Sequence, residues 1–587
     1  MWRERDDEQQ RLLASLRRRA TAGQIDRRGF LHLATAIGID AGFAVALADQ
    51  VMPAPVVQGQ GGRSIEAAYD YIIVGAGSAG CTVAARLSED ATCRVLLVEA
   101  GGADISRPAL QNPVLWPSNF GTDVDWAYRT TPQARAAGRI IDWPRGKVIG
   151  GSSSINAMIW VWGAAADFDQ WAYAGCRGWD YARLKSAFQS IETCARESLN
   201  SDRGTNGPIH VEPVADPNPL SRGFFKACEE MGHQVLEDVG APVRDGAGYM
   251  DFNTKDGRRF SVVHGYLLPA LERRNLTLLT GTRVAGLCFE GYRCTGVRLQ
   301  MDAALTDVVA EQETILCAGV IESPRLLMLS GIGNAKELRR YGISVVSDLS
   351  GVGKNLQDHC FLVGFAAETK APIPGTRAGS HLFFRSIKEA YGPDLHAVLG
   401  TAAVGTMDVR PNEGFSIRLG LLRPQSRGRI RITSADLNAP LLVDPNYLSA
   451  GADVTSLCAA VEHSRAIGSA AGLSEWRKRE IPRTPSGKSE LKEFIARNLE
   501  SYWHPVGTCA MGVHQEAVVD PSLCVYGTRN LRVADASVMP AITSGNTNAP
   551  TIVIAERAAQ MIIRSATSRA TAGPSGTAVI ATTSAAS

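Results

Sequence analysis

The stretch from Asp70 to Glu99 has the order strand, glycine-rich turn, helix, strand and terminal acid within about 30 residues. Apolar runs at 71–74 and 95–98 predict two buried parallel strands, and the residues between them have a helical pattern. This arrangement predicts a Rossmann-like unit that binds an adenine dinucleotide. The motif does not distinguish NAD from FAD, and it does not say which reaction the cofactor serves.

Three glycines and one acid give this motif its chemistry. Gly75 permits the tight turn, Gly77 lets the backbone approach a pyrophosphate, and Gly80 lets the helix pack against the strand. The helix N-terminus, at Ser78, faces the phosphate charge. Glu99 can accept hydrogen bonds from ribose hydroxyls.

Length and composition exclude several other classes. The 587 residues exceed one compact core and predict two or more domains. The net charge of +2 gives nucleic-acid binding no electrostatic support. The sequence contains no uninterrupted run of 18 apolar residues, so we expect no conventional membrane span. The 12 cysteines form no C-x-x-C pairs or Cys/His clusters, which argues against a metal site or a disulfide framework; a single Cys288–Cys294 bridge stays open.

Residues 1–66 have the composition of a leader followed by a linker. Paired arginines at 27–28 precede a mildly apolar stretch and an Ala-Leu-Ala sequence at 46–48, which resembles a twin-arginine export signal with its cleavage site. We therefore expect a periplasmic protein; the alternative is a cytoplasmic one. Residues 49–66 predict a flexible linker, and 566–587, rich in Ala, Ser, Thr and Gly, predict a disordered tail.

A second glycine-rich segment and the centre of the chain complete the expected fold. The loop at 142–156 offers many backbone donors that can wrap a polar cofactor, at Gly146, Gly151, Ser152 and Asn156. A strand at 314–316 is followed by a helix that Pro324 is expected to open. Residues 414–422 and 428–433 alternate in β fashion and indicate an antiparallel sheet in a separate domain. The fold class is α/β, or α+β overall, with helices expected at 452–466 and 489–499.

Candidate chemistry lies near the C-terminus. His504 stands between Trp503 and Pro505, and histidine is the side chain best suited to exchange a proton near neutral pH. One histidine among ten is more often structural than catalytic. Asn546 can hydrogen-bond an alcohol or alkoxide oxygen, and Thr551 lies at a helix N-terminus whose positive dipole suits an electron-rich acceptor.

These segments together resemble the glucose–methanol–choline (GMC) family of flavoprotein oxidoreductases. The resemblance runs from Tyr69 to Ile563. It rests on motifs in a fixed order: the 75–99 fingerprint, the loop at 146–154, Ala318-Gly319, Ser323-Pro324, the Leu-Ser-Gly-Ile-Gly sequence at 329–333, the segment 351–359 ending in Asp358-His359, His504-Pro505, and the segment 535–550.

The resemblance implies FAD and the oxidation of an alcohol. It implies that His504 accepts the hydroxyl proton while hydride passes to flavin N5, that Asn546 holds the substrate oxygen, and that the Thr551 region stabilises the reduced flavin. Some relatives have histidine where this chain has Asn546, and the His/Asn pair is similar to that of choline and hydroxymethylfurfural oxidases. The electron acceptor would be oxygen or a quinone or cytochrome.

The resemblance also implies further cofactor contacts. Asp535 would approach the phosphate–ribityl region and Val284 the adenine, with Ala536 and Asn548 also at the cofactor. Some relatives attach FAD through a loop histidine; the matching residue here is Ile155, so non-covalent FAD is expected. The domains expected are an FAD-binding domain of 67–163, 251–360 and 502–565, and a substrate or cap domain of 164–250 and 361–501.

Three other functions stay open at this point. The same scaffold could carry a hydroxynitrile lyase with no net redox change, the fingerprint could hold NAD, or the chain could bind a flavin or a partner without catalysis. Flavin bleaching by alcohols would exclude the lyase, and a yellow purified protein would exclude NAD. The presence of both His504 and Asn546 argues against a protein that only binds a flavin or a partner.

Overall fold

The computed structural model describes residues 65–196, 202–214, 218–301, 304–374, 379–402, 413–481, 485 and 487–572, together with isolated positions before residue 34. The predicted export signal and nearly all of the linker fall outside the described residues, as do residues 573–587. The predicted disordered tail begins too early, because helix α14 (Asn548–Ala572) continues through 566–572. Alanine favours a helix there, and residues 566–572 contain no Gly or Pro that would end it.

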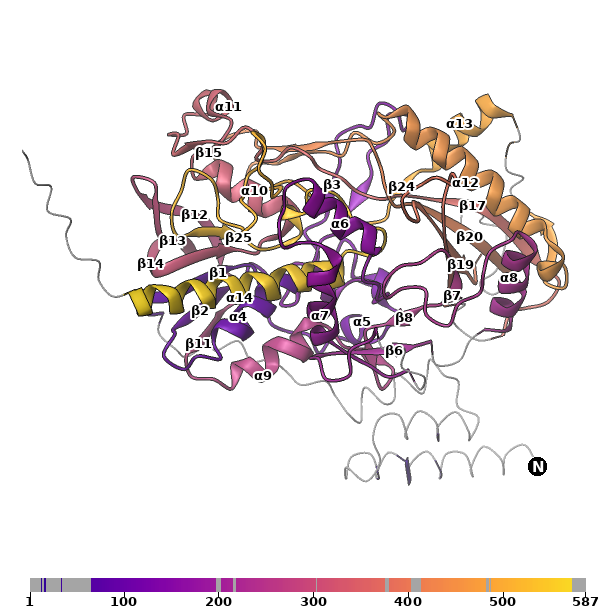
Figure 1. The fold of residues 1–587 in the computed structure, drawn as a ribbon, viewed down its shortest axis with the longest axis horizontal. Helices are drawn as coiled ribbons and strands as arrows, with labels where there is room; N and C mark the ends of the chain where they lie inside the picture. The colour runs from indigo at the N-terminus through magenta and orange to yellow at the C-terminus, as the bar shows by residue number, and fades with distance from the viewer. Residues whose placement is uncertain are drawn as a thin grey trace, which may run out of the picture.

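The first of two large sheets has seven strands and is mostly parallel; it is here called the Rossmann-like sheet (Figure 1, left). The apolar runs of β1 and β2 pair in parallel from Tyr71↔Val95 to Val74↔Val98, and both strands are almost wholly buried. The order is β11-β2-β1-β14-β13-β12 with β25 beside β14. The strands are β1 (Ala68–Val74), β2 (Val95–Val98), β11 (Leu276–Leu279), β12 (Arg283–Glu290), β13 (Arg293–Met301), β14 (Ala304–Leu316) and β25 (Leu531–Val533).

Two helices from opposite ends of the chain pack together on this sheet. Helix α4 (Ser78–Leu87) runs beside the yellow helix α14 in front of β1 and β2 (Figure 1). Arg86 of α4 forms an ion pair with the buried Glu556 of α14, which also accepts a hydrogen bond from Tyr266 Oη at 2.7 Å. The C-terminal segment is therefore fixed against the dinucleotide-binding motif.

The second large sheet has seven strands and is antiparallel (Figure 1, right). Its order is β23-β17-β20-β19-β18-β7 with β24 beside β17, and helix α12 packs against β17 and β20. The sequence prediction of an α/β fold with a Rossmann-like sheet and a separate antiparallel sheet is confirmed. The strands are β7 (Gly246–Tyr249), β17 (Cys360–Thr369), β18 (Ser380–Phe384), β19 (Leu395–Gly400), β20 (Gly414–Leu421), β23 (Arg477–Glu480) and β24 (Glu500–Ser501).

The remaining elements connect and flank these two sheets. The helices are α5 (Pro108–Gln111), α6 (Ala165–Tyr173), α7 (Tyr181–Ile191), α8 (Pro219–Glu230), α9 (Leu268–Leu271), α10 (Gly319–Leu329), α11 (Ala335–Arg340), α12 (Gly451–Ser469) and α13 (Lys488–Asn498). Shorter strands are β3 (Tyr128–Arg129), β4 (Asp142–Trp143), β5 (Glu192–Cys194), β6 (Ile209–Pro213), β8 (Asp251–Phe252), β9 (Thr254–Lys255), β10 (Arg258–Arg259), β15 (Ile332–Gly333), β16 (Ser347–Asp348), β21 (Arg429–Arg431) and β22 (Leu442–Asp444).

Two local predictions need correction, and the question of a Cys288–Cys294 bridge is answered. Helix α10 begins at Gly319, so Pro324 lies inside it rather than at its start. The missing proline N–H would leave the Val320 carbonyl without its helical donor, but Thr508 Oγ1 donates to that carbonyl at 2.6 Å. Residues 429–431 form β21, which pairs with β22 in a separate ribbon and not with the antiparallel sheet. Cys288 and Cys294 are both free.

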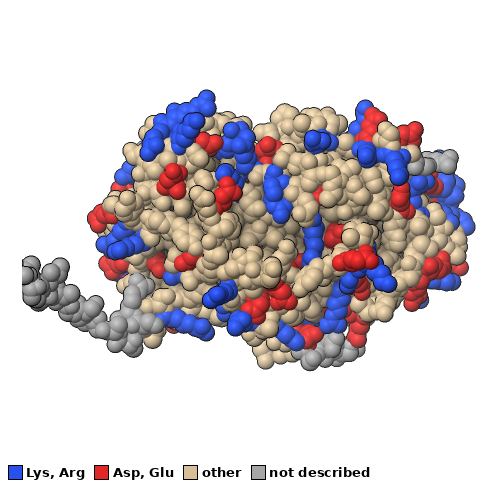
Figure 2. Space-filling model, turned by 45° about the horizontal axis from the view of Figure 1, so that its top comes forward, with Lys and Arg blue, Asp and Glu red and all other residues tan. Residues whose placement is uncertain are grey.

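The surface carries charges of both signs. Figure 2 shows Lys and Arg side chains interspersed with Asp and Glu over the face in view, in keeping with a net charge of +2. None of the helices in the described part of the chain is both long and apolar enough to cross a membrane.

Candidate active site

One cavity of about 620 Å³ extends from the glycine fingerprint to the antiparallel sheet. Its walls come from segments distant in the sequence, which the packing of α4 on α14 brings together. The cavity is lined by nearly all of the residues that the sequence analysis singled out: Gly75, Gly77, Ser78, Glu99, Gly146, Gly151, Ser152, Ile155, Asn156, Val284, His504, Asp535, Ala536, Asn546, Asn548 and Thr551.

The fingerprint glycines divide into two kinds. Gly80 does not line the cavity; a Cβ there would lie 1.8 Å from the Gly75 carbonyl oxygen, so this glycine permits close packing of α4 on β1. Gly77 faces the cavity, and a Cβ there would meet nothing nearer than Gly151 Cα at 3.9 Å. The space beside Gly77 is thus open on the cavity side, as the approach of a pyrophosphate requires.

The acid that ends β2 is buried beside the fingerprint. Glu99 accepts hydrogen bonds from the backbone N–H groups of Ala76 and Gly101, both at 2.8 Å. Burial raises the pKa of the Glu99 carboxyl to about 7, although these hydrogen bonds oppose that shift. The carboxyl lines the cavity and can hydrogen-bond a ribose.

The loop at 146–156 folds against the fingerprint. Gly151 has φ +51° and its Cα would lie 3.9 Å from a Cβ at Gly77, so two glycine-rich turns meet back to back. Ser152 Oγ accepts from the Gly146 N–H at 3.2 Å, and Asn156 Oδ1 accepts from Arg259 Nη1 at 2.6 Å. These contacts hold the loop over the cavity.

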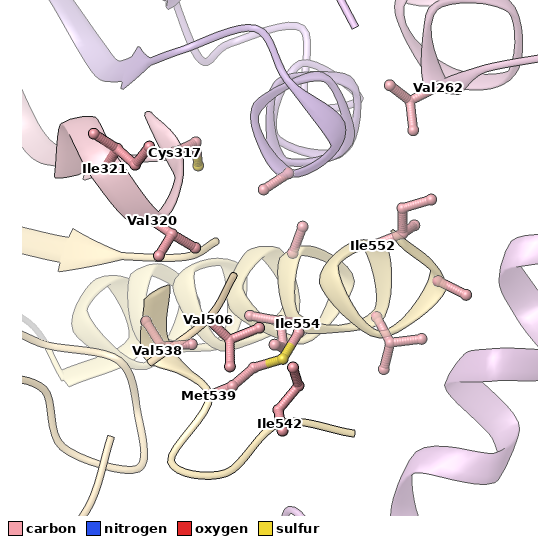
Figure 3. Close-up of a cluster of buried hydrophobic side chains, with 14 of the residues drawn as sticks. Val262, Cys317, Val320, Ile321, Val506, Val538, Met539, Ile542, Ile552 and Ile554 are labelled. Atoms are coloured by element: carbon pink, nitrogen blue, oxygen red, sulfur yellow. The ribbon is translucent and has the colours of Figure 1, made fainter. Parts of the chain in front are cut away.

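The C-terminal segment closes the other side. Asp535 accepts from the Gly319 N–H at 2.8 Å and Ser323 Oγ at 2.6 Å, and Asn548 Oδ1 accepts from Ser78 Oγ at 2.8 Å. Burial raises the pKa of Asp535. Apolar side chains of this segment, together with Val506, lie beside Ile554 of α14 and fix the path of the chain toward Asn546 (Figure 3): Val538, Met539 and Ile542.

The backbone at His504 is held by buried polar groups. Asp358 accepts from the His504 N–H at 2.8 Å and from Ser501 Oγ at 2.6 Å, and Arg145 Nη2 donates to the Trp503 carbonyl at 2.6 Å. Trp503 has φ +59°, a left-handed conformation that non-glycine residues rarely adopt. Such strain persists only where the surroundings enforce it, which is common at functional sites.

A chain of hydrogen bonds determines which nitrogen of His504 carries the proton. His359 Nε2 lies 3.0 Å from the Leu422 carbonyl, which can only accept, so this nitrogen carries a hydrogen. His359 Nδ1 is then an acceptor, and His504 Nδ1, 3.0 Å away, is the donor. His504 Nε2 therefore carries the lone pair, and Asn546 Nδ2, 3.0 Å away, donates a hydrogen bond to it.

The surroundings keep this histidine uncharged. Burial lowers the pKa of His504 well below 6.5, and the neighbouring His359, Arg145 and His396 lower it further. A neutral imidazole with an exposed lone pair at Nε2 is competent as a general base near neutral pH. Asn546 Oδ1 is buried and has no hydrogen-bond partner among the described residues, so a polar group of a ligand can pair with it.

Three aromatic rings form an apolar wall next to this pair. Trp116, Phe120 and Trp503 make edge-to-face contacts with centroids 5.3–5.7 Å apart, and all three line the cavity. The cavity thus has a polar end with glycine-rich turns and helix N-termini, and an apolar end beside a histidine base. These donors fit a flavin dinucleotide.

Comparison with known proteins identifies the family. A family model described as GMC oxidoreductase matches residues 69–361, and a second model of the same description matches 424–555. The chain belongs to the GMC oxidoreductase family. It is an FAD-dependent oxidoreductase, as the resemblance in sequence predicted.

Individual GMC relatives are similar over most of their length. The chain is 38% identical to an alcohol dehydrogenase [acceptor] of Pseudomonas putida, over 84% of this chain and 96% of that one, and 37% identical to human mitochondrial choline dehydrogenase, over 84% and 89%. Among solved structures, pyridoxine 4-oxidase from Mesorbium loti has a TM-score of 0.80 and 38% identity, over 84% of this chain and 99% of that chain.

Several residues of this GMC site did not emerge from the sequence analysis. Arg145, His359 and Arg418 line the cavity or contact its histidine, yet each had no assigned role. The one available signal was the adjacent Asp358-His359 pair directly before the apolar run at 360–363, since an acid and a histidine next to a buried strand are unusual.

Proposed function

We propose that this protein oxidises an alcohol to an aldehyde or ketone, with His504 as the general base. The observation that carries the proposal is the hydrogen-bond chain from Leu422 through His359 to His504, which leaves the His504 Nε2 lone pair in the cavity beside Asn546. A substrate hydroxyl would replace the Asn546 N–H at Nε2 and give its proton to that nitrogen.

Asn546 has a matching role in this proposal. Its Nδ2 carries two hydrogens, so it can donate to the substrate oxygen as negative charge develops there, and its unpartnered Oδ1 can accept from a further polar group. The aromatic wall of Trp116, Phe120 and Trp503 would hold the carbon skeleton and exclude water.

The flavin, when bound, supplies the hydride acceptor. Ile155 is the residue at the loop position where some relatives attach FAD through histidine, and an aliphatic side chain cannot form that bond, so we propose that FAD is held without a covalent link. Gly80 does not contact the cofactor in this proposal but lets α4 pack closely against Gly75. We propose that FAD is held by residues that line the cavity: Gly75, Gly77, Ser78, Glu99, Gly146, Gly151, Ser152, Asn156, Val284, Asp535, Ala536, Asn548 and Thr551.

An anaerobic panel of alcohols tests the function. Oxidised holoenzyme is mixed with each alcohol without oxygen, the flavin absorbance is followed, and oxygen is then admitted. Loss of the oxidised-flavin absorbance with formation of a carbonyl product supports the proposal. A yellow protein that releases an aldehyde from a cyanohydrin, with no bleaching by any alcohol, would instead indicate a lyase. Prompt re-oxidation by oxygen indicates an oxidase, and re-oxidation by a quinone or cytochrome alone indicates a dehydrogenase.

We also propose export to the periplasm, supported by the paired Arg27-Arg28 and the apolar stretch that follows. Cell fractionation tests it: the protein should move to the cytoplasm when Arg27 and Arg28 are both replaced by lysine. An unchanged distribution would contradict the proposal.

A further inference from the structure

An arginine of the antiparallel sheet projects into the cavity. Arg418 lies on β20, where it pairs with Val398 of β19 and Val363 of β17. Arg418 and Val398 both line the cavity, as does Phe361, which pairs with Gly420 two residues further along β20. Leu419, between them, points to the opposite face, where α12 packs. Because successive side chains of β20 point to opposite faces of the sheet, Arg418 points to the cavity.

Arg418 forms no ion pair with any acid in the described part of the chain. Its Nε is buried without a hydrogen-bond partner among the described residues, whereas the two other arginines of the cavity wall bond backbone or side-chain oxygens. Burial lowers the pKa of Arg418, and the Tyr502 phenol opposes this shift. Arg418 is half-buried, and its buried Nε lacks a partner among the described residues, so this site is suited to an anion.

The carboxylates of the cavity wall are all engaged elsewhere. Glu99 and Asp535 accept backbone N–H groups beside the Rossmann-like sheet, and Glu322 accepts from Tyr128 Oη and Arg325. Within the described part of the wall, the antiparallel sheet thus offers a positive charge and no acid.

A second unpaired polar atom lies next to Arg418. Ser416, two residues earlier on the same face of β20, has a buried Oγ without a partner among the described residues. Both atoms border Gly400 of the neighbouring strand: a Cβ at Gly400 would lie 3.1 Å from Ser416 Oγ and 3.7 Å from Arg418 Nε. A guanidinium and a hydroxyl that converge on a position without a side chain can together bind two oxygens of one planar anion.

We propose that Arg418 and Ser416 bind a carboxylate carried by the alcohol substrate, so that hydroxy acids are the preferred substrate class. This inference rests on the proposed function for its substrate, but the anion site itself does not depend on turnover. It also predicts poor use of cationic alcohols such as choline, the substrate named for the human relative, because a buried guanidinium repels a quaternary ammonium.

Matched substrates test the preference. The rate of anaerobic flavin reduction is compared for ω-hydroxycarboxylates of increasing chain length and for their uncharged methyl esters. We expect the best acid to exceed its ester in kcat/KM by about 10- to 100-fold, the range of charge-assisted hydrogen bonds to a buried cation. Arg418→Met should remove this difference between acid and ester, and Arg418→Lys should retain part of it. Equal use of acid and ester by the wild-type enzyme would overturn the proposal without any variant.

Binding separates this proposal from the proposed function. Carboxylates that lack a hydroxyl, the corresponding alkanoates, are titrated calorimetrically into wild-type, Arg418→Met and Ser416→Ala holoenzymes whose FAD content and melting temperature match. Binding that falls about 10-fold or more in Arg418→Met supports the site even if no alcohol reduces the flavin, in which case the proposed function alone fails. Binding that is the same in wild type and Arg418→Met, with alcohols still oxidised, overturns the carboxylate site and leaves the proposed function intact.

Discussion

The Nδ1 atoms of His359 and His504 lie 3.0 Å apart, with their rings at 89°, and this contact decides the tautomer of His504. His359 is completely buried, and its own tautomer is set by the Leu422 carbonyl. The Leu422 carbonyl, directly after β20, thus determines through two rings where the lone pair of the base lies. His359 is a positioning residue in this account, since it touches the base and not the substrate.

Removing the acceptor on His359 should impair the reaction. We expect His359→Leu to slow anaerobic flavin reduction by about 10- to 100-fold, because His504 loses the partner that orients it and sets its tautomer. His359→Asn, whose Oδ1 can still accept from His504 Nδ1, should recover part of the rate. His381→Leu is the matched control, since His381 bonds His396 and not His504. Equal rates for His359→Leu and the control would argue against this role.

The amide of Asn546 should matter for the chemical step more than for cofactor binding. We expect Asn546→Ala to lower the limiting rate of flavin reduction by about 100-fold, since the donor to the developing alkoxide is lost. FAD content should be unchanged, because the amide bonds His504 and its Oδ1 has no partner among the described residues. Stopped-flow reduction together with the FAD-to-protein ratio checks both statements. A rate within twofold of wild type would contradict the assignment.

Two fingerprint glycines should respond to alanine in opposite ways. A Cβ at Gly77 meets nothing nearer than 3.9 Å, so Gly77→Ala should fold normally yet lose FAD affinity by 10-fold or more, since the methyl group enters the pyrophosphate space. A Cβ at Gly80 would lie 1.8 Å from the Gly75 carbonyl oxygen, so Gly80→Ala should destabilise the fold itself. Melting temperature of the apoprotein and FAD affinity separate the two effects. A Gly77→Ala variant with wild-type affinity would show that the cofactor binds elsewhere.

Acid should destabilise the protein. Burial lowers the pKa values of His359 and His381 to about 3, and those of His396 and His504 also fall below 6.5. The unfolded chain binds these protons below about pH 6.5 and the native state does not, so stability is complete above that pH and decreases as pH falls. Each histidine contributes about 1.4 kcal/mol per pH unit below pH 6. Glu99, with its pKa raised to about 7, opposes one of the four.

Urea unfolding of the holoenzyme at pH 7.5 and 5.5 measures this effect. We expect a lower midpoint at pH 5.5, and a smaller difference between the two pH values in His381→Asn, which removes one titrating group. A midpoint that is equal or higher at pH 5.5 would contradict the account.

Much of the fold was accessible from the sequence because its signals are local. The fingerprint, the apolar runs of β1 and β2, and the alternation of 414–422 each report structure within a few residues. The start of α10 was wrong because Pro324 is tolerated inside that helix, and its tolerance depends on Thr508, which lies far away in the chain. The extent of α14 was underestimated because composition cannot tell a helical alanine-rich segment from a disordered one.

The candidate site was predicted where motifs name residues and missed where roles come from contacts. His504 and Asn546 were found through the family resemblance, and the structure brings them within 3.0 Å. Arg418 is one of many arginines in the sequence, and what sets it apart is that its buried Nε has no partner among the described residues, which no local pattern reveals. His359 stood in a quoted motif, but its function follows from the direction of two hydrogen bonds.

The most direct test of the central claim is the rate of anaerobic flavin reduction by an alcohol in His504→Ala, measured against wild type at equal FAD content. We expect the variant to retain FAD, because His504 belongs to the substrate end of the cavity, and to reduce it about 10²- to 10⁴-fold more slowly, as loss of a general base requires. Flavin reduction in His504→Ala at the wild-type rate would contradict it.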